Sequence, residues 1–249
     1  MFISILTITK NDLDGLKRTA VSISNLITDL TEEAAVSFEW VVKSGDHVSG
    51  LDDYDLGPAL PSCPTKFDAN PDNGIYDAMN RAVELAEGDW ILFMNSGDSF
   101  AKTASDFFVS CLRYSYDRSG IFYGASDAKS IFPKAQEKLY PRLARLPSHQ
   151  TMLIPINIQK DFPFYTAYPV SADKDFKIRT IRFGVPYIFI DKIVCLREPG
   201  GVSVNMPSHE VLWKRTQEQY LIMRKNFGVP TALFYASAFY LWNYRKLFL

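Results

Sequence analysis

The chain has 249 residues, 47% of them hydrophobic and 22% charged, and its formal net charge is -1. These values are typical of a globular protein with a packed core, and they exclude extended disorder. The near-zero charge also excludes global attraction to nucleic acid, so we expect no nucleic-acid partner. The length favours one large α/β domain with room for an appended segment.

Cysteine usage and the first residues of the chain indicate a compartment. Cys63, Cys111 and Cys195 are odd in number and far apart, without the spacing of a zinc site or a disulfide framework. The first ten residues contain no basic leader and no small-residue cleavage site, so we expect a buried strand there rather than a secretion signal. Together these features predict a cytoplasmic protein.

Strand and helix patterns alternate in the first half of the chain. Apolar residues recur at helical spacing after a β-rich first segment, and they do so again before an apolar run that begins at Trp90. This alternation predicts an α/β fold with a mostly parallel sheet flanked by helices. The predicted strands are Phe2 to Thr9, Phe38 to Val42, Thr65 to Asp68 and Trp90 to Met94, and the predicted helices are Leu13 to Ile27 and Gly74 to Ala86.

The second half of the chain is less regular. A segment from Ala232 to Leu249 is dense in Phe, Tyr, Leu and Trp, and it predicts a C-terminal helical extension. Before it we expect helices at Thr103 to Tyr116, Asp173 to Phe183 and Val211 to Phe227, strands at Ile121 to Gly124, Met152 to Ile154 and Tyr187 to Cys195, and a polar connector from Ser126 to about Ser148.

A polar tetrad follows the apolar strand that begins at Trp90. Its residues are Asn95, Ser96, Gly97 and Asp98. In open α/β sheets, ligands bind outside the carboxyl ends of the strands, so Asp98 is expected where a metal ion or a phosphate group can meet it. This placement predicts an enzyme.

Several short strings stand out along the chain. They are Ser4-Ile-Leu-Thr-Ile-Thr-Lys-Asn11, Glu39-Trp-Val-Val42, Asp72-Asn-Gly-Ile-Tyr-Asp-Ala-Met-Asn80, Phe93-Met-Asn-Ser-Gly-Asp98, Ser148-His-Gln150, Ser171-Ala-Asp173 and Gly200-Gly-Val-Ser203. They occur in the order seen in family 2 glycosyltransferases of bacterial surface polysaccharide assembly. The chain most resembles the colanic-acid and O-antigen members, from Ser4 to Ser203, and Gly74 to Asp98 is the specific part. The resemblance implies a GT-A fold, a nucleotide-sugar donor, a divalent metal ion and inversion at the anomeric carbon.

The predicted metal ligand is Asp98. A Mn²⁺ or Mg²⁺ ion stabilises the charge that grows on a leaving diphosphate, and such an ion can take one protein carboxylate when phosphates and waters supply its other ligands. The family pattern has an Asp-x-Asp cluster, whereas Asp98 is the single acid of this tetrad. The alternative is that Asp98 caps the following turn.

The resemblance implies a donor site made by several loops. Asp72 precedes the Gly74 helix, where it can cap the helix or accept a hydrogen bond from a nucleobase or a sugar hydroxyl. Asp77 and Asn80 share a helix face, which is either a solvated polar face or a donor contact. Gly74, Asn95, Ser96 and Gly97 belong to the same expected donor site.

Residues after the first and second strands are further donor-site candidates. The hydroxyls of Thr7 and Thr9 lie on one side of the first strand and can reach a nucleotide beside Asn11. The family has Val-Asp-Gly-Gly-Ser after its second strand, whereas this chain has Lys43-Ser-Gly-Asp46. Either Asp46 replaces the nucleoside-contacting Asp through a shifted loop, or Ser44 makes a weaker contact.

An inverting transfer needs a general base for the acceptor hydroxyl. Asp173 matches the acid of the family's acceptor-side motif, and Asp175 is its rival; the alternative is that both acids only favour a helix N-terminus. The resemblance places His149 and Gln150 beside the donor sugar or the acceptor. Gly200 and Gly201 form either a loop whose amides approach the diphosphate or an ordinary turn.

The apolar run from Val229 to Tyr244 is shorter than the ~20 residues that span a bilayer. It is expected either to lie in the membrane interface, with Arg245 and Lys246 near anionic lipid, or to pack on the core or another subunit. A lipid-linked acceptor, as the resemblance implies, favours peripheral contact with the inner face of the cytoplasmic membrane. The expected organisation is a catalytic domain over 1–205, with a nucleotide-sugar half (1–100) and an acceptor half (101–205), followed by a helical segment over 206–249.

The sequence thus predicts a metal-dependent inverting hexosyltransferase. It would move a sugar, with a UDP-hexose as the first donor to consider, onto an undecaprenyl-diphosphate-linked glycan in O-antigen, capsule or colanic-acid biosynthesis. A second hypothesis is a nucleotide-sugar-binding protein without catalysis, because Ser44 and the thinned acidic cluster depart from the family pattern. A third is a nucleotidyltransferase-like α/β enzyme, although the chain has no P-loop pattern.

Overall fold

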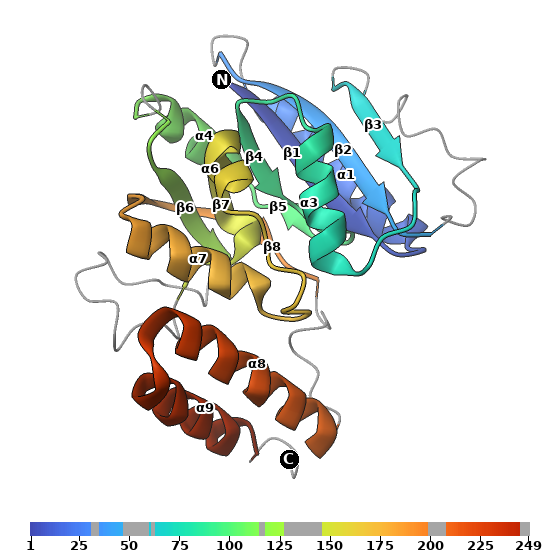
Figure 1. Cartoon of the computed structure of the whole chain (residues 1–249). Helices are drawn as coiled ribbons and strands as arrows, with labels where there is room; N and C mark the ends of the chain where they lie inside the picture. The colour runs from blue at the N-terminus through green and yellow to red at the C-terminus, as the bar shows by residue number, and fades with distance from the viewer. Residues whose placement is uncertain are drawn as a thin grey trace.

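The computed structural model describes residues 1–30, 35–46, 60, 63–114, 118–126, 146–198 and 208–244. The strands in this part of the chain form one eight-stranded sheet in the order β3-β2-β1-β4-β7-β6-β8-β5, with helices on both faces and two further helices at the C-terminal end (Figure 1). The expected α/β fold with a mostly parallel sheet and a C-terminal helical extension is confirmed.

The first half of the chain forms the regular part of the sheet. Strands β3, β2, β1 and β4 are parallel neighbours, and in their register Thr9 at the end of β1 lies beside Ser44 at the end of β2. Loops that follow these strands therefore meet at one edge of the sheet. The elements are β1 (Phe2–Thr9), α1 (Leu13–Asp29), β2 (Ser37–Ser44), β3 (Thr65–Asp68), α3 (Ile75–Leu85) and β4 (Trp90–Phe93).

The second half extends the sheet with mixed direction. Strand β7 is antiparallel to both β4 and β6, β6 is parallel to β8, and the short β5 is antiparallel to β8. This arrangement returns the chain to the same edge at the start of β7. The elements are β5 (Ser99–Phe100), α4 (Ala104–Leu112), β6 (Ile121–Ser126), the 3-10 turn η2 (His149–Thr151), β7 (Met152–Pro155), α6 (Ile156–Asp161), α7 (Ala172–Phe183) and β8 (Tyr187–Leu196).

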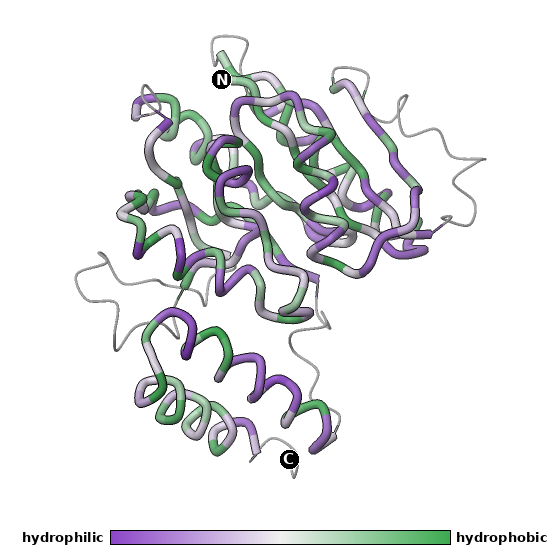
Figure 2. The backbone as a smooth tube through the Cα atoms, in the orientation of Figure 1, coloured by the Kyte–Doolittle hydropathy of each residue, from purple (hydrophilic) through white to green (hydrophobic). Residues whose placement is uncertain are grey.

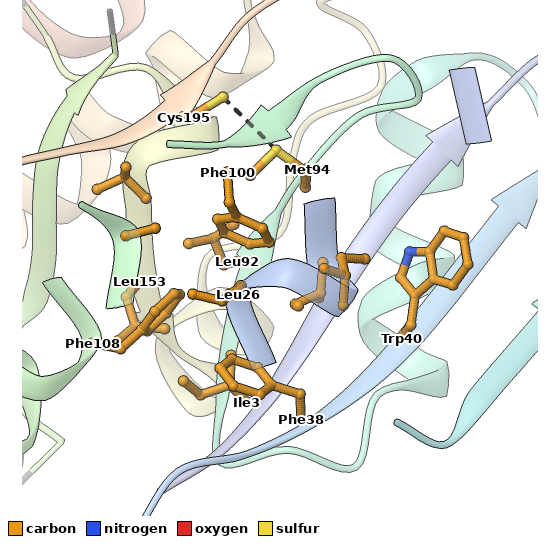
Figure 3. Close-up of a cluster of buried hydrophobic side chains, with 14 of the residues drawn as sticks. Ile3, Leu26, Phe38, Trp40, Leu92, Met94, Phe100, Phe108, Leu153 and Cys195 are labelled. Carbon is orange, nitrogen blue, oxygen red and sulfur yellow. Dashed lines mark hydrogen bonds between the residues drawn. The ribbon is translucent and has the colours of Figure 1, made fainter. Parts of the chain in front are cut away.

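Two apolar clusters cover the two faces of the sheet. Alternate residues of β1 point to opposite faces, so that Ile3 and Ile5 join one cluster and Leu6 joins the other. Helices α1 and α4 complete the first cluster, whose buried side chains include Phe38 and Phe108 (Figure 3). Helices α3, α6 and α7 complete the second. Because both faces are covered, the central strands are apolar along nearly their whole length.

Helices α8 (His209–Phe227) and α9 (Val229–Tyr244) form a hairpin at the C-terminal end. Helix α8 contacts both α7 and α9. Its colouring contains long hydrophilic stretches, whereas α9 is hydrophobic along most of its length (Figure 2). Among the described helices, none combines the length and the apolar composition that crossing a bilayer requires.

Three details differ from the sequence prediction, in which helical spacing puts Ile75 and Met79 on one apolar face of the helix that follows Gly74. The short β5 and α6 were not predicted, because two and six residues are too few to show a clear period. On α3, Tyr76 is 6% exposed, whereas Ile75 is 38% exposed. The buried face of α3 therefore begins at Tyr76 and not at Ile75. This orientation of the helix places the Tyr76 hydroxyl inside, where it belongs to the candidate site.

Candidate functional site

The loop after β4 is held tightly against the start of α1. The Ser96 hydroxyl donates to the Asp12 carboxylate at 2.9 Å, and the Gly97 amide donates to the Thr19 hydroxyl at 3.1 Å. Asp12 also caps α1 by accepting from the Gly15 amide. Gly97 has φ +90°, a conformation that disfavours every residue with a Cβ. Ser96 and Gly97 thus form a rigid turn that places Asp98.

Asp98 is 5% exposed and is bonded through both carboxylate oxygens. Oδ2 accepts from the Gln150 amide nitrogen at 3.1 Å, and Oδ1 accepts from the Glu198 backbone N–H at 2.8 Å. Burial raises the pKa of Asp98, although these two bonds and the nearby His149 oppose that rise. The predicted alternative was that Asp98 caps the following turn. Its side chain instead points across the sheet edge, toward η2 and the end of β8.

The residues at this edge can contribute to a divalent-cation site but cannot form one alone. Among the described residues, no group of three or more His, Cys, Asp or Glu side chains is close enough to hold an ion. Asp98 supplies a carboxylate, and the Asn95 Oδ1 atom is buried without a hydrogen-bond partner in the described chain. Both are hard oxygen donors of the kind that Mn²⁺ or Mg²⁺ accepts. These two residues therefore fit an ion whose other ligands come from a diphosphate and water.

His149 joins the β4 loop to the start of α7. Its Nε2 lies 3.3 Å from the Asn95 amide nitrogen, and its Nδ1 lies 3.6 Å from Asp173 Oδ2. Since the Asn95 amide nitrogen is a donor, these contacts favour the tautomer with the proton on Nδ1. Gln150, the next residue, contacts Asp98. The predicted pair His149 and Gln150 thus connects the candidate metal ligand to the candidate base.

Asp173 accepts hydrogen bonds from two residues that the sequence reasoning missed. The Tyr76 hydroxyl donates to Oδ1 at 3.1 Å, and Lys177 Nζ donates to Oδ2 at 2.7 Å. Burial opposes ionisation of Asp173, but the charge of Lys177 and the contact with His149 outweigh it and hold its pKa well below the usual range. Asp173 is therefore a carboxylate at every physiological pH. The signals available were the i,i+4 spacing of Lys177 and the position of Tyr76 inside the matched motif.

Asp175 has a different environment. Its side chain is fully buried, accepts from Arg179 Nε at 2.7 Å and accepts from the Asn226 amide at 3.2 Å. These bonds direct Asp175 into the interface between α7 and α8, away from His149. Of the two acids considered for the base, Asp173 is therefore the one at the site.

A cluster of charged residues lies at the ends of β2 and β3. Lys43 is fully buried, and its Nζ lies 3.5 Å from Asp68 and 3.9 Å from Asp72. Asp72 also accepts from the Gly74 amide at 2.9 Å, and a Cβ on Gly45 would come within 2.5 Å of its carboxylate. Gly74 has φ +114°, so a glycine suits the turn that starts α3. Asp72 is thus held beside the β2 loop, where a nucleoside would be contacted.

Ser44 and Asp46, the two alternatives for a nucleoside contact, differ in burial. Ser44 is fully buried and donates to the Asp46 carbonyl at 2.6 Å, whereas Asp46 is exposed. A buried hydroxyl that is engaged with its own loop is poorly placed to contact a nucleoside. Asp46 is therefore the better candidate of the two.

The first strand contributes one candidate where two were expected. The Thr7 hydroxyl accepts from the Trp40 indole at 2.8 Å inside the core, so the expectation that Thr7 reaches a nucleotide is wrong. Thr9 is 5% exposed, and within the described chain its hydroxyl has no hydrogen-bond partner. Asn11, two residues later, has φ +47°. Thr9 and Asn11 therefore remain candidates at the same edge.

Asp77 and Asn80 have structural partners. Asp77 accepts from the Asn73 amide at 2.9 Å and pairs with Arg81 at 3.3 Å. The Asn80 amide donates to the Phe164 carbonyl at 2.9 Å and accepts from the Phe164 N–H at 3.0 Å. The expected donor contact of Asn80 is therefore replaced by a bond to the segment before α7. Gly200 and Gly201 lie outside the described residues.

No family model matches the chain, but relatives described as glycosyltransferases match parts of it. An uncharacterized glycosyltransferase of Mycobacterium tuberculosis is 35% identical over 102 residues, which are 40% of this chain and 35% of the relative. A PGL/p-HBAD biosynthesis glycosyltransferase of Mycobacterium bovis is 40% identical over 53 residues, 21% of each chain. The matched part thus spans about a third of the first relative's length and about a fifth of the second's.

Solved structures extend the similarity to the whole fold. Staphylococcus aureus TarS 1-349, in complex with UDP-GlcNAc, has a TM-score of 0.65 at 16% identity and covers 89% of this chain and 65% of that chain. Mannosyltransferase PcManGT of Pyrobaculum calidifontis, in complex with GDP-Man and Mn²⁺, has a TM-score of 0.61 at 14% identity and covers 95% and 73%. The fold is therefore the GT-A fold of these transferases.

Proposed function

We propose that the chain is a metal-dependent inverting glycosyltransferase of family 2. The observation that supports this most directly is the pair His149 and Gln150, whose side chains contact Asp173 and Asp98 respectively. One turn of chain thus connects a carboxylate suited to a metal–diphosphate group with a carboxylate suited to an acceptor hydroxyl. These two groups must stand on either side of the reacting carbon in an inverting transfer.

The donor is bound at the edge formed by the ends of β1, β2 and β4. Asp72 or Asp46 accepts from the nucleobase, and Thr9, Asn11 and Asn95 contact the rest of the nucleotide-sugar. Thr9 Oγ1 and Asn95 Oδ1 have no hydrogen-bond partner among the described residues, and this supports the assignment, since buried polar atoms in proteins normally have a partner. A Mn²⁺ or Mg²⁺ ion held by Asp98, with Asn95 near it, would neutralise charge on the leaving diphosphate. A UDP-hexose is the first donor to test.

Asp173 accepts the proton of the acceptor hydroxyl. Its low pKa keeps it ionised, and Tyr76 and Lys177 fix its two oxygens. The remaining lone pairs of Oδ1 and Oδ2 are the available acceptors for a hydroxyl. A second candidate function is nucleotide-sugar binding without catalysis, and the ion pair with Lys177 favours it because that pair weakens Asp173 as a base.

We propose a lipid-linked glycan as the acceptor, with undecaprenyl diphosphate as the carrier, and peripheral contact with the inner face of the cytoplasmic membrane. Helix α9 exposes large apolar side chains, among them Phe234 at 78% and Trp242 at 71%. A groove of about 550 Å³ between α8 and α9, lined by Trp213, Leu233 and Tyr240 among others, is of a size that admits an acyl or prenyl chain. In this arrangement residues 1–100 bind the donor, 101–205 the acceptor, and 206–249 the membrane.

The test is nucleoside diphosphate release by the purified protein with UDP-, GDP- and dTDP-sugars. Each donor is offered with and without Mn²⁺ and a synthetic lipid-diphosphate sugar acceptor. Release that needs one donor, the acceptor and the metal ion supports the transferase and identifies its donor. Donor binding without release across a broad acceptor panel favours the non-catalytic candidate, and release without metal would contradict the role of Asp98.

A further inference from the structure

The start of α7 is bonded to a buried glutamate of the C-terminal hairpin. Glu218 on α8 is 6% exposed, and its Oε1 accepts from the Val170 N–H at 3.0 Å and from the Ser171 N–H at 2.8 Å. These two amides come immediately before α7, where backbone N–H groups lack intrahelical partners. A side chain 47 residues further along the chain therefore supplies their acceptor.

The neighbouring glutamine strengthens the same connection. The Gln219 amide donates to the Ser171 hydroxyl at 2.8 Å, and its Oε1 accepts from Lys174 Nζ at 2.5 Å. Lys174 also donates to the Tyr235 hydroxyl of α9 at 2.7 Å. The first turn of α7 is thus bonded to both helices of the hairpin by buried or half-buried polar groups.

The segment before Asp173 is held by hydrogen bonds from two sides. The Tyr76 hydroxyl shares its one proton between the Val170 carbonyl at 2.9 Å and Asp173 Oδ1 at 3.1 Å, while Glu218 accepts from the amides of the same turn. Asp173 follows Ser171 by two residues, so any rotation of this turn moves its carboxylate relative to His149 and Lys177. The backbone of this turn is therefore the means by which Glu218 affects the candidate base.

We infer that Glu218 is a positioning residue for Asp173, so that the C-terminal hairpin completes the reaction site rather than only attaching it to a surface. The inference rests on the proposed function, because it assigns Asp173 as the base. Glu218 does not touch the reacting groups. It fixes the turn that presents Asp173, and Gln219 assists by holding the Ser171 side chain.

The test compares three glutamate variants of the full chain in acceptor-dependent turnover. E218A removes the acceptor of both amides, whereas E218Q retains an oxygen at the same place. E210A is the matched control, because Glu210 lies on the same helix in an exposed pair with Lys214. We expect E218A to lower kcat about ten- to a hundredfold, since a displacement near 1 Å can cost about a hundredfold. KM for the donor should be unchanged, and E218Q and E210A should stay near wild type.

A structural readout separates this inference from the proposed function. Amide hydrogen exchange at 170–174 should accelerate in E218A and remain slow in E218Q and E210A, whether or not a donor has been identified. If E218A does not fold, Q219A takes its place, because it breaks the bonds to Ser171 and Lys174 without removing the carboxylate. Unchanged kcat in E218A, equal losses of kcat and donor binding, or no rescue by E218Q would overturn the inference. Absence of wild-type turnover would instead count against the proposed function.

Discussion

The sheet domain and the C-terminal hairpin distribute polar and apolar residues in opposite ways. In the sheet domain the strands are apolar inside, and polar side chains gather where the strands end. In the hairpin, α8 buries Glu218, Gln219 and Asn226 against α7, whereas α9 exposes Phe234 and Trp242. The difference indicates two kinds of surface. One edge of the sheet gathers polar side chains, and α9 leaves large apolar side chains exposed.

The contrast also explains how the two regions are joined. Apolar packing alone tolerates small shifts between helices, but the paired hydrogen bonds of Glu218 and Asn226 select one arrangement of α8 on α7. A hairpin held by such bonds keeps its exposed face at a constant position relative to Asp173. The comparison can be sharpened by substitutions on each side of this boundary.

A large loss of turnover is expected at the sheet edge. D98A should lower metal-stimulated turnover by about 10²–10³, the range found when a group that stabilises developing charge is removed. D106A is the control, because Asp106 lies in an exposed pair with Lys192. Nucleoside diphosphate release with varied Mn²⁺ measures both. Full metal dependence in D98A would show that the ion binds elsewhere.

The same site should respond to pH in a defined direction. Burial raises the pKa of Asp98, so its ionised form is lost at a higher pH than for an ordinary aspartate. A metal ion binds the ionised form. The apparent affinity for Mn²⁺ should therefore fall on acidification, and the fall should begin at a higher pH than for an ordinary aspartate, whose pKa is ~3.9. Titrations with Mn²⁺ between about pH 5 and pH 8, where proteins tend to be most stable, measure this affinity.

The two acids of α7 should separate function from stability. D173N should lower acceptor-dependent transfer by about 10²–10⁴, the usual contribution of a general base, with donor binding retained. D175N should instead lower the free energy of unfolding by about 3–5 kcal/mol, because it breaks the buried pair with Arg179. Denaturant unfolding and steady-state kinetics on both variants distinguish the roles. Equal transfer rates in wild type and D173N would show that another group is the base.

The apolar face of the hairpin should control membrane binding. The double variant F234S/W242S should reduce the fraction bound to anionic vesicles at least about tenfold, since burying one large apolar side chain contributes about 1.5–3 kcal/mol. V21S is the control, because Val21 is 60% exposed on α1 of the sheet domain. Turnover on a short soluble acceptor should not change. Undiminished vesicle binding by the double variant would assign this face to another partner.

The smallest effect is expected at the boundary between α7 and the hairpin. Burial, followed by the charge of Lys177, lowers the pKa of Lys174 to about 7, while Asp173 and Glu218 oppose the shift. Between about pH 7 and the ordinary lysine pKa of 10.5, Lys174 is therefore protonated more fully in the unfolded chain than in the folded chain. The stability of the wild type rises with pH over this window. K174M lacks this gain.

We therefore expect the Tm of K174M relative to wild type to decrease between pH 7 and pH 10, by about 2–4 °C for each ~1 kcal/mol of this gain in a domain of this size. Thermal unfolding monitored by circular dichroism measures the difference. K214M is the control, because Lys214 is exposed on α8, and its difference from wild type should not depend on pH. A pH-independent difference for K174M would show that Lys174 keeps an ordinary pKa.

Periodicity located most elements within one or two residues, because each long element repeats its apolar pattern several times. Thus β1 and β3 begin and end where predicted, and α7 begins one residue earlier. The short β5 and α6 contain too few residues for such a pattern, and pairing with β8 and packing on β7 define them. The boundary errors reflect the same limit.

The candidate site was predicted in its types of residue but not in its partners. Asp98, His149, Gln150 and Asp173 were singled out, and the structure brings them together through the contacts of Gln150 with Asp98, 52 residues apart, and of His149 with Asp173. Thr7 was a wrong candidate, because the alternation of a strand does not reveal that the Trp40 indole occupies its hydroxyl. Tyr76 and Lys177 were missed, because their importance comes from the carboxylate that they bind.

The sequence by itself determined the α/β class, the polar tetrad at the end of β4 and the aromatic C-terminal segment, because composition and local periodicity encode these directly. Only the tertiary structure decided that Asp173 rather than Asp175 faces His149, and that Glu218 binds the turn before α7. The physical reason is that the two acids lie two positions apart, about 200° around α7, so the rotation of the helix selects which acid faces the sheet edge. That rotation is set by packing and hydrogen bonds between segments far apart in the chain.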